Sequence, residues 1–317
     1  MLASGVHSYP TSSSSRFLYI ADALRLAKKL PKPDVVSAQD PFETGLAAWL
    51  IARRFRAPLH VQVHTDFLSP EFARHSLLNR LRILIARFVL KRASGIRVVS
   101  ERIRHSLEAR SSPVRRILGT GGKLNAHVTV LPIFVDIGRF NTPKKDRALE
   151  SRFMHFKQKI LVVSRLEREK NVSLALEAFT KSAPSEACLI IVGEGSERGW
   201  LEKKARKRGI AGRVFFEGAQ DPAPYYALAD LILFPSRYDG YGMVIIEALA
   251  AGKPVLATDV GVAREAGAII AERHQFSGAL LAWFKNGPRT AELLDYPYKD
   301  FGEYVRAYCA DITACTK

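Results

Sequence analysis

Residues 159–171, KILVVSRLEREKN, place a short apolar run directly before a charged loop and the start of a helix. Val162 and Val163 are β-branched, which favours a strand, and the loop after them is rich in charge. The same order recurs at residues 231–247, LILFPSRYDGYGMVIIE, where an apolar run precedes a glycine-containing loop and a second helix. A strand followed by a loop and a helix is the repeating unit of a parallel α/β sheet.

This alternation extends over most of the chain. Apolar, β-rich runs predict strands at 34–38, 59–63, 95–100, 128–131, 159–164, 188–192, 213–217, 231–234 and 254–258. Helical patterns lie between them, near 42–56, 76–93, 101–110, 171–182, 196–208, 223–229, 243–251 and 276–286. Strict alternation predicts parallel sheets with helices on both faces, in two Rossmann-like domains that face each other across a cleft.

The domain boundaries follow from where the pattern lapses. Regular periodicity is lost at residues 132–146, so we predict a first domain over 1–137 and a second over 138–297. Residues 298–317 are predicted to form a C-terminal helix that packs back on the first domain. A doubly wound domain normally opens with a strand, whereas this chain opens with a serine-rich loop and a helix near 16–29. We therefore expect the first domain to lack its opening strand, as in an N-terminally truncated chain.

Composition narrows the class of protein. Of the 317 residues, 47% are hydrophobic and 25% are charged, which excludes wholesale disorder. Three cysteines without a C-x-x-C pair exclude a disulfide scaffold and a cysteine zinc site, and they suit a reducing compartment. No run of residues is apolar enough for a membrane span. We expect a cytoplasmic protein that is peripheral on a membrane face at most.

The net charge of +17 indicates an anionic partner. Residues 70–127 contain thirteen Lys or Arg against three acids, which gives this segment a charge of +10. An anionic membrane surface is one candidate partner, and a solvated basic face is the alternative. Nucleic acid is set aside because the basic motifs lack interleaved aromatic residues. An apolar stripe in the same segment predicts either a membrane-surface helix or a core-facing one: Leu77, Leu78, Leu81, Leu84, Ile85 and Phe88.

The loop after the strand at 159–164 carries two cations, Arg165 and Lys170, just before a helix that opens at Asn171. In open α/β sheets, ligands bind outside the carboxyl ends of the strands. Backbone N–H groups at a helix N-terminus favour anions, and an arginine fork matches phosphate oxygens. These residues therefore indicate a phosphate site.

The loop after the strand at 231–234 carries Asp239, Gly240 and Gly242, and Glu247 follows on the next helix. The two glycines let the backbone approach a ligand closely. Eight helical residues span roughly 12 Å, more than the ~5–5.5 or ~6.5–9.5 Å that separate the carboxylates of glycosidases. We therefore expect Asp239 and Glu247 to bind hydroxyl groups at two ends of an extended ligand, rather than to act as a hydrolytic pair.

These residues belong to an ordered set of motifs. In the second half the set is Ser164-Arg165-Leu166-x-x-Glu169-Lys170-Asn171, Val192-Gly193-Glu194-Gly195, Pro235-Ser236, Asp239-x7-Glu247-Ala248 and Ala251-Gly252-Lys253-Pro254-Val255. In the first half it is His64-Thr65-Asp66, Val99-Ser100-Glu101 and Pro132-x-x-Val135-Asp136-x-x-Arg139-Phe140. In order and spacing, the chain resembles the retaining glycosyltransferases of family 4, which have the GT-B fold.

The resemblance implies a role for each matching residue. Arg165 and Lys170 hold the diphosphate of a nucleotide-sugar donor, and Glu247 binds the ribose. The donor sugar and phosphate face Asp239 and the backbone amides of Gly240, Tyr241, Gly242, Met243 and Val244. Gly193 and Gly195 lie near the nucleotide, Glu217 flanks the base, and His64 lies near the donor sugar and the acceptor. Asp239 departs from the family pattern, in which a glutamate, one methylene longer, occupies this position.

The implied activity is transfer of a sugar from a nucleotide-diphosphate sugar to an acceptor hydroxyl with retention, the acceptor being a glycan or lipid-linked. No Asp-x-Asp pair follows a strand, so we expect neither a metal nor another cofactor. Two alternatives stay open: a nucleotide-sugar epimerase, and a truncated, non-catalytic protein that binds a nucleotide sugar.

Overall fold

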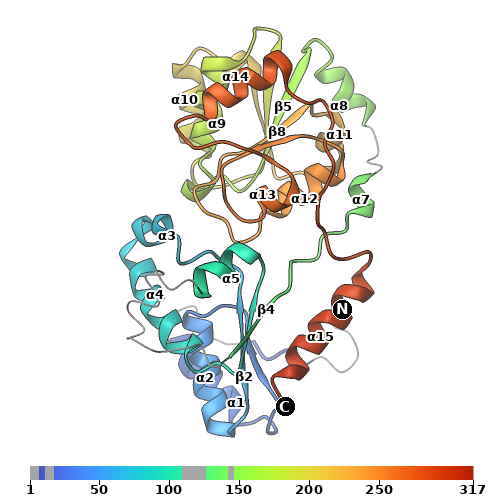
Figure 1. Cartoon of the computed structure of the whole chain (residues 1–317). Coiled ribbons are helices and arrows are strands. Elements are labelled where there is room, and N and C mark those ends of the chain that lie inside the picture. Colours follow the sequence, from blue (N-terminus) through green and yellow to red (C-terminus); the bar gives the residue numbers. More distant parts are fainter. Residues whose placement is uncertain (1–6, 11–17, 109–125, 142–145, 317) are drawn as a thin grey trace. The chain divides into compact units, whose positions relative to one another are not determined.

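The computed structural model describes residues 7–10, 18–108, 126–141 and 146–316 (Figure 1). The chain divides into two compact units, the first formed by residues 1–132 and 302–317 and the second by residues 133–301. The boundaries predicted at 137/138 and 297/298 lie a few residues from these. Each unit is built on a parallel β-sheet, which confirms the α/β class with two parallel sheets.

The first unit has a four-stranded parallel sheet. Its strands, in spatial order, are β1 (Val36–Ala38), β2 (Leu59–Val63), β3 (Gly95–Val98) and β4 (His127–Val130). Its helices are α1 (Leu18–Ala27), α2 (Glu43–Phe55), α3 (Pro70–His75), α4 (Leu77–Leu90), α5 (Glu101–Glu108) and α15 (Phe301–Ala314). Serine caps start α3 and α4, because Ser69 and Ser76 accept hydrogen bonds from the backbone N–H groups of Glu71 and Asn79. The predicted strands are all present.

Two central strands of this sheet bury polar side chains. Strand β2 is buried along its whole length, yet it contains His60 and Gln62, and β3 contains the buried Arg97. Each of these groups has one partner on the C-terminal helix α15, such as Asp311, which lies 251 residues along the chain from His60. Buried polar groups are costly unless they are hydrogen-bonded, so these pairs fix α15 to the sheet.

Helix α4 turns its apolar stripe away from the core. Leu77 is 78% exposed, and Leu78, Leu81 and Leu84 are exposed as well, whereas the buried side chains of α4 are Asn79, Ala86, Val89 and Leu90. At 100° per residue, positions 77, 81 and 84 lie on the side of the helix opposite to 86 and 90. The core-facing interpretation of the stripe is therefore wrong for its exposed leucines. Phe88, at the C-terminal end of the stripe, does pack: its ring meets that of Trp49 edge to face, with the ring centroids 4.8 Å apart.

The second unit has a six-stranded parallel sheet in the order β10-β9-β8-β5-β6-β7. Its strands are β5 (Gln158–Val163), β6 (Ala187–Val192), β7 (Val214–Gly218), β8 (Leu231–Phe234), β9 (Val255–Ala257) and β10 (Ile269–Ile270). Its helices are α7 (Gly138–Asn141), α8 (Arg147–Arg152), α9 (Val172–Ser182), α10 (Arg198–Lys207), α11 (Ala223–Leu228), α12 (Met243–Ala250), α13 (Ala263–Ala266) and α14 (Phe276–Asn286). The two-residue strand β10 was not predicted, because two isoleucines give no period to detect.

The core of the second unit joins one face of the sheet to α9, α10 and α14. Phe179 of α9 and Phe276 of α14 are fully buried there against strand residues such as Ile160. Burial of this kind is the main stabilising term of a domain, at about 25 cal/mol per Å² of apolar surface. Among the described residues, every helix is too short or too polar to cross a lipid bilayer.

Candidate functional site

The strand order of the second unit marks one edge of its sheet. Strand β5 pairs with β6 on one side and with β8 on the other, so the direction in which the chain crosses the sheet reverses between β5 and β8. In open parallel α/β sheets, ligands bind outside the carboxyl ends of the strands at such a point. The loop after β5 carries Arg165 and Lys170, and the loop after β8 carries Asp239. The topology therefore brings together two segments that the sequence singled out separately.

A charged pair joins the two loops. The Lys170 Nζ atom lies 2.6 Å from Asp239 Oδ2, and both side chains are more than four-fifths buried. Backbone contacts fix the loops beside it, because the Arg237 N–H donates to the Glu169 carbonyl at 2.7 Å. Asn171 takes a left-handed conformation with φ 52° and donates from its side-chain amide to the Pro235 carbonyl at 3.2 Å. The positions of Lys170 and Asp239 are therefore set by the fold.

Arg165 has a different environment. Its side chain is 70% exposed, and its Nη2 atom lies 3.1 Å from Glu169 Oε1 in a surface ion pair. An exposed pair of this kind is screened by solvent and is worth little, so the guanidinium is free to exchange Glu169 for another anion. The two cations of this loop thus combine one buried, fixed charge with one exposed, movable charge.

The glycines after β6 are required by packing between loops. Gly193 has φ +137°, and a Cβ atom there would lie 1.8 Å from the Ser164 carbonyl oxygen. A Cβ at Gly195 would lie 2.5 Å from the Leu166 carbonyl oxygen. Both glycines therefore let the segment after β6 lie directly against the loop that holds Arg165.

The N-terminus of α12 closes the same edge. Gly242, with φ +91°, precedes the helix, and the Tyr241 N–H donates to Asp239 Oδ1 at 3.3 Å. Met243 is exposed, Val244 is partly covered, and Gly240 is buried. Helix N-termini present N–H groups with a favourable dipole, so this segment suits an anion next to Lys170.

Glu247 lies one to two turns further along α12. Its Oε2 atom accepts a hydrogen bond from the Tyr226 hydroxyl at 2.8 Å. Burial raises the pKa of Glu247, and the Tyr226 hydrogen bond and the Arg139 charge only partly oppose that rise. The Tyr226 hydrogen bond uses one lone pair of this carboxylate and leaves others for further hydroxyl donors.

Glu217 is already engaged. Its two oxygens accept from the Arg152 guanidinium at 2.6 and 2.8 Å, and Oε2 also accepts from the Tyr225 hydroxyl at 3.1 Å. Sequence reasoning missed Arg152 and Tyr225. They lie 65 residues before and 8 residues after Glu217, in positions with no motif around them.

His64 belongs to the first unit, directly after β2. Its Nε2 atom lies 3.2 Å from Gln62 Oε1. Burial lowers the pKa of His64, and the positive charge of Arg97 lowers it further, so the imidazole is neutral at pH 7. Asp66, two residues on, is buried with a raised pKa, chiefly because of burial, and its Oδ1 atom has no hydrogen-bond partner among the described residues.

Comparison with known proteins identifies the family of the chain. Residues 149–282 match the family model described as "Glycosyl transferases group 1", and residues 3–118 match the one described as "Glycosyl transferase 4-like domain". The two matches follow each other along the chain and together cover most of it. The chain therefore belongs to the glycosyltransferases that these two models describe.

Individual relatives share about a quarter of their residues with this chain. The chain is 25% identical to the alpha-monoglucosyldiacylglycerol synthase of Streptococcus pneumoniae, over 93% of this chain and 70% of that protein. It is 27% identical to a glycogen synthase of Mycobacterium tuberculosis, over 74% of this chain but only 54% of that protein, so it spans about half of that relative's length.

Two solved structures share the fold. A structure of HepE from Anabaena in complex with UDP and glucose matches with a TM-score of 0.67 and 20% identity, over 85% of this chain and 73% of that one. Sucrose-phosphate synthase from Thermosynechococcus elongatus matches with a TM-score of 0.70 and 18% identity, over 95% and 76%.

The raised pKa of Glu247 predicts a gain in stability when its charge is removed. The folded state holds this proton to a higher pH than the unfolded chain does, so ionisation lowers stability as pH rises from about 4.5 through the folded pKa. Glu247→Gln should therefore raise the Tm at pH 8, by on the order of 2–4 °C, the shift that about 1 kcal/mol produces in a domain of this size. The gain should vanish below pH 4.5.

Calorimetry of both proteins from pH 4 to pH 8 checks this. Glu177→Gln is the control of opposite sign, because the Lys181 hydrogen bond lowers the pKa of Glu177, and its Tm should not rise at pH 8. A Glu247→Gln protein that is less stable than the wild type at pH 8 would show that the Tyr226 hydrogen bond outweighs the burial.

Proposed function

We propose that this chain transfers a sugar from a nucleoside-diphosphate sugar to a hydroxyl group of an acceptor, with retention at the anomeric carbon. The observation that carries the proposal is the pair of cations, Arg165 and Lys170, at the edge of the sheet where β5 and β8 end. Asp239 and the N-terminus of α12 lie at the same edge. This arrangement suits a diphosphate with a polyhydroxy group attached.

The charges account for the chemical step. When the bond from the anomeric carbon to the diphosphate oxygen breaks, negative charge grows on the departing diphosphate. Arg165 and Lys170 stabilise that charge, and such electrostatic stabilisation is usually the largest single contribution to catalysis. The acceptor oxygen forms the new bond to the anomeric carbon, and its proton passes to the departing phosphate oxygen. Attack from the same face as the leaving group gives retention, as the family resemblance implies.

Asp239 and Lys170 would exchange partners when the donor binds. In the described structure they neutralise each other. A phosphate oxygen is a stronger partner for the ammonium group, since it carries the charge of the diphosphate. Asp239 is then released to accept hydrogen bonds from sugar hydroxyls.

The nucleotide occupies the neighbouring positions in this proposal. Glu247 accepts from the ribose hydroxyls, Gly193 and Gly195 lie near the nucleotide, and Glu217 flanks the base. His64 is the residue of the first unit that we propose to contact the acceptor. A UDP-sugar is the first donor to test, because the HepE structure holds UDP. Neither an epimerase nor a non-catalytic binding protein gains support from the family models or the relatives named above.

A lipid-linked acceptor agrees with the surface of the first unit. The outer face of α4 consists of the exposed leucines 77, 78, 81 and 84, and Arg74, Arg80 and Lys91 are exposed around it. Apolar side chains flanked by cations suit an anionic membrane surface. The pneumococcal relative is named as a synthase of a glycolipid. We propose that α3 and α4 dock this chain on the cytoplasmic face of a membrane.

Other basic residues of segment 70–127 are buried or form ion pairs within the protein. Arg97 is buried, and Arg82 pairs with Glu43 at 3.0 Å. Arg74 and Arg104 form exposed ion pairs with Glu71 and Glu101, which solvent screens. Arg87 is partly buried, and burial lowers its pKa. Four further cations lie outside the described residues: Arg110, Arg115, Arg116 and Lys123.

The donor site gives the first functional prediction. Arg165→Ala and Lys170→Ala should each lower the rate of transfer by about 10²–10³, because each removes a cation from the departing diphosphate. The measurement is release of UDP from UDP-sugar in the presence of a glycolipid or glycan acceptor. Arg168→Ala is the matched control, since Arg168 is an exposed cation of the same loop, and its rate should stay near that of the wild type. Near-normal rates in both test variants would refute the assignment.

The second prediction concerns metal ions. Because the two cations neutralise the diphosphate, transfer should continue at an undiminished rate in EDTA. Loss of activity in EDTA that magnesium or manganese restores would contradict this.

The third prediction concerns the membrane. The chain should sediment with vesicles that contain anionic lipid and not with neutral vesicles, and added salt should weaken binding because exposed charges are screened over ~8–10 Å. Replacing Arg74, Arg80 and Lys91 with Gln should reduce sedimentation, since each cation near an anionic surface contributes about 1 kcal/mol. The triple variant Lys203→Gln, Lys207→Gln, Arg208→Gln removes the same charge from the second unit and should bind like the wild type. If the chain binds neutral and anionic vesicles equally, or binds neither, the docking proposal is wrong. Segment 70–127 is then a basic face in contact with solvent.

A further inference from the structure

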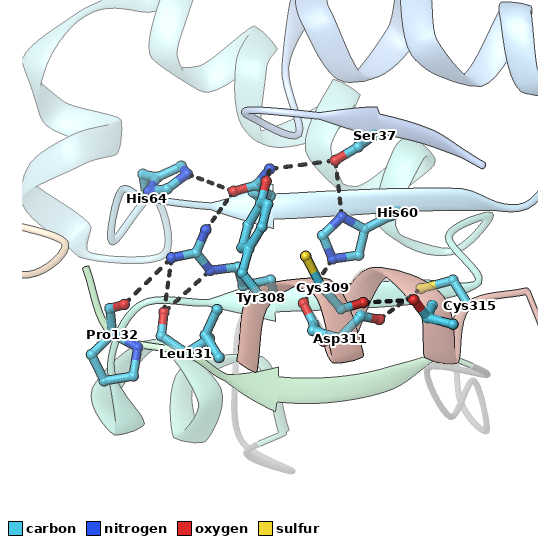
Figure 2. A network of polar contacts seen from close by, with 12 residues as sticks. Ser37, His60, His64, Leu131, Pro132, Tyr308, Cys309, Asp311 and Cys315 are labelled. Atoms are coloured by element: carbon cyan, nitrogen blue, oxygen red, sulfur yellow. Dashed lines mark hydrogen bonds and ion pairs between the residues drawn. The ribbon is translucent and has the colours of Figure 1, made fainter. Parts of the chain in front are cut away.

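A network of polar contacts around the buried side chains of Gln62 and Arg97 connects His64 to the C-terminal helix (Figure 2). Gln62 lies at its centre. Its Oε1 atom accepts from Arg97 Nη1 at 2.7 Å and faces His64 Nε2 at 3.2 Å. Its Nε2 atom donates to the hydroxyl oxygens of Tyr308, at 2.6 Å, and Ser37, at 3.3 Å. Tyr308 belongs to α15, so both ends of the chain supply partners for this one amide.

Arg97 decides which way the Gln62 amide faces. A guanidinium has only donors, so the atom that meets Arg97 must be the carbonyl oxygen of Gln62. Arg97 is itself held in place, since it donates to the Leu131 carbonyl at 3.2 and 3.1 Å and to the Tyr304 hydroxyl at 3.2 Å. Its guanidinium also lies over the Tyr308 ring, 4.8 Å from the centroid. A flip of the amide would turn its NH2 group toward the guanidinium and remove the acceptor that Arg97 Nη1 has in Gln62.

The orientation of Gln62 fixes the tautomer of His64. The Gln62 oxygen is an acceptor, so His64 must carry its proton on Nε2. The neutral ring then presents an acceptor lone pair on Nδ1, and within the described part of the chain no hydrogen bond to Nδ1 is formed. Burial lowers the pKa of His64 most, and the positive charge of Arg97 from β3 lowers it further. The negative charge of Asp40, from the loop after β1, raises it.

A second branch of the network anchors the other side of the amide. Ser37 Oγ lies 2.9 Å from His60 Nδ1, and His60 Nε2 lies 3.0 Å from Asp311 Oδ2 on α15. The Asp311 carboxylate accepts only, so His60 carries its proton on Nε2, and its Nδ1 accepts from the Ser37 hydroxyl. Every donor in the branch then meets an acceptor. This branch holds Ser37 and α15 in place, but it does not decide which ring nitrogen of His64 carries the proton.

We propose that Gln62 is a positioning residue for His64: oriented by Arg97 and clamped by Tyr308, it keeps His64 in the Nε2–H form and leaves Nδ1 to accept a hydrogen bond from a substrate hydroxyl. The ligand class is a sugar or acceptor hydroxyl, which donates to Nδ1. The inference rests on the proposed function for the identity of that hydroxyl, whereas the tautomer depends on the network alone.

The test uses the full chain labelled with 15N-histidine. The imidazole signals report which nitrogen carries the proton, and a His64→Gln sample identifies the His64 signal among the eight histidines. The wild type should show Nε2–H at neutral pH. Gln62→Met removes the acceptor, so both tautomers should be populated, and kcat should fall about tenfold while the KM for the nucleotide sugar changes little.

Gln62→Glu is the conservative variant. A carboxylate keeps an acceptor for Arg97 and for His64, so the protein should fold and His64 should show Nε2–H at high pH. The added negative charge favours the imidazolium ion, in which Nδ1 becomes a donor. The low-pH limb of kcat should therefore move to higher pH than in the wild type, and activity should recover as the ring loses its proton.

Asp311→Asn separates positioning from structural support. This change removes the carboxylate at the far end of the second branch, so it should lower the Tm while the His64 signal keeps the Nε2–H pattern. Cys309→Ala, at an exposed position of the same helix, should change neither.

Three results would overturn the proposal. They are Nδ1–H in the wild type, an unchanged tautomer in Gln62→Met, and a loss of Nε2–H in Asp311→Asn as large as in Gln62→Met. Absence of transfer with every donor would instead count against the proposed function, and the 15N pattern would still decide the role of Gln62.

Discussion

The parallel pairing of β5 with both β6 and β8 is the constraint on which the second unit depends. Parallel strands end at one edge of a sheet, so the pairing delivers the loops after β5 and β8 to the same place. The bonds between Arg237 and Glu169, and between Asn171 and Pro235, then set the loops close enough for Lys170 to meet Asp239. The charged pair is a consequence of topology, and the left-handed backbone at Asn171 is the local strain that this close approach requires.

A buried cation plays the corresponding part in the first unit. Taking the Arg97 guanidinium out of water costs on the order of several kcal/mol unless its donors are met. Carbonyl groups after β4 meet some of them, and Gln62 and Tyr304 meet others. Because Tyr304 lies on α15, the sheet of this unit is satisfied only when the C-terminal helix is in place. The same demand orients Gln62, and through Gln62 it reaches His64.

The distribution of charge separates two uses of basic residues. Some arginines of segment 70–127 are engaged within the fold: Arg97 is buried, and Arg82 forms a half-buried ion pair with Glu43. Others, such as Arg74 and Arg80, are exposed beside the outer leucines of α4 and add to the net charge of +17. A count along the sequence gives the total charge of a segment, and burial divides that total between structure and surface.

The sequence by itself determined the strand–helix alternation, the parallel sheets, and the loops that hold Arg165, Lys170 and Asp239. These features are local: β-rich runs, helix starts and the residues after a strand can be recognised within about twenty positions. Only the tertiary structure decided that Arg97 is buried, that Arg152 pairs with Glu217, and that α4 turns its leucines outward. A local pattern carries no information about a partner 65 or 251 residues away, and a helix with apolar residues on two faces does not reveal which one is buried until the sheet is beside it.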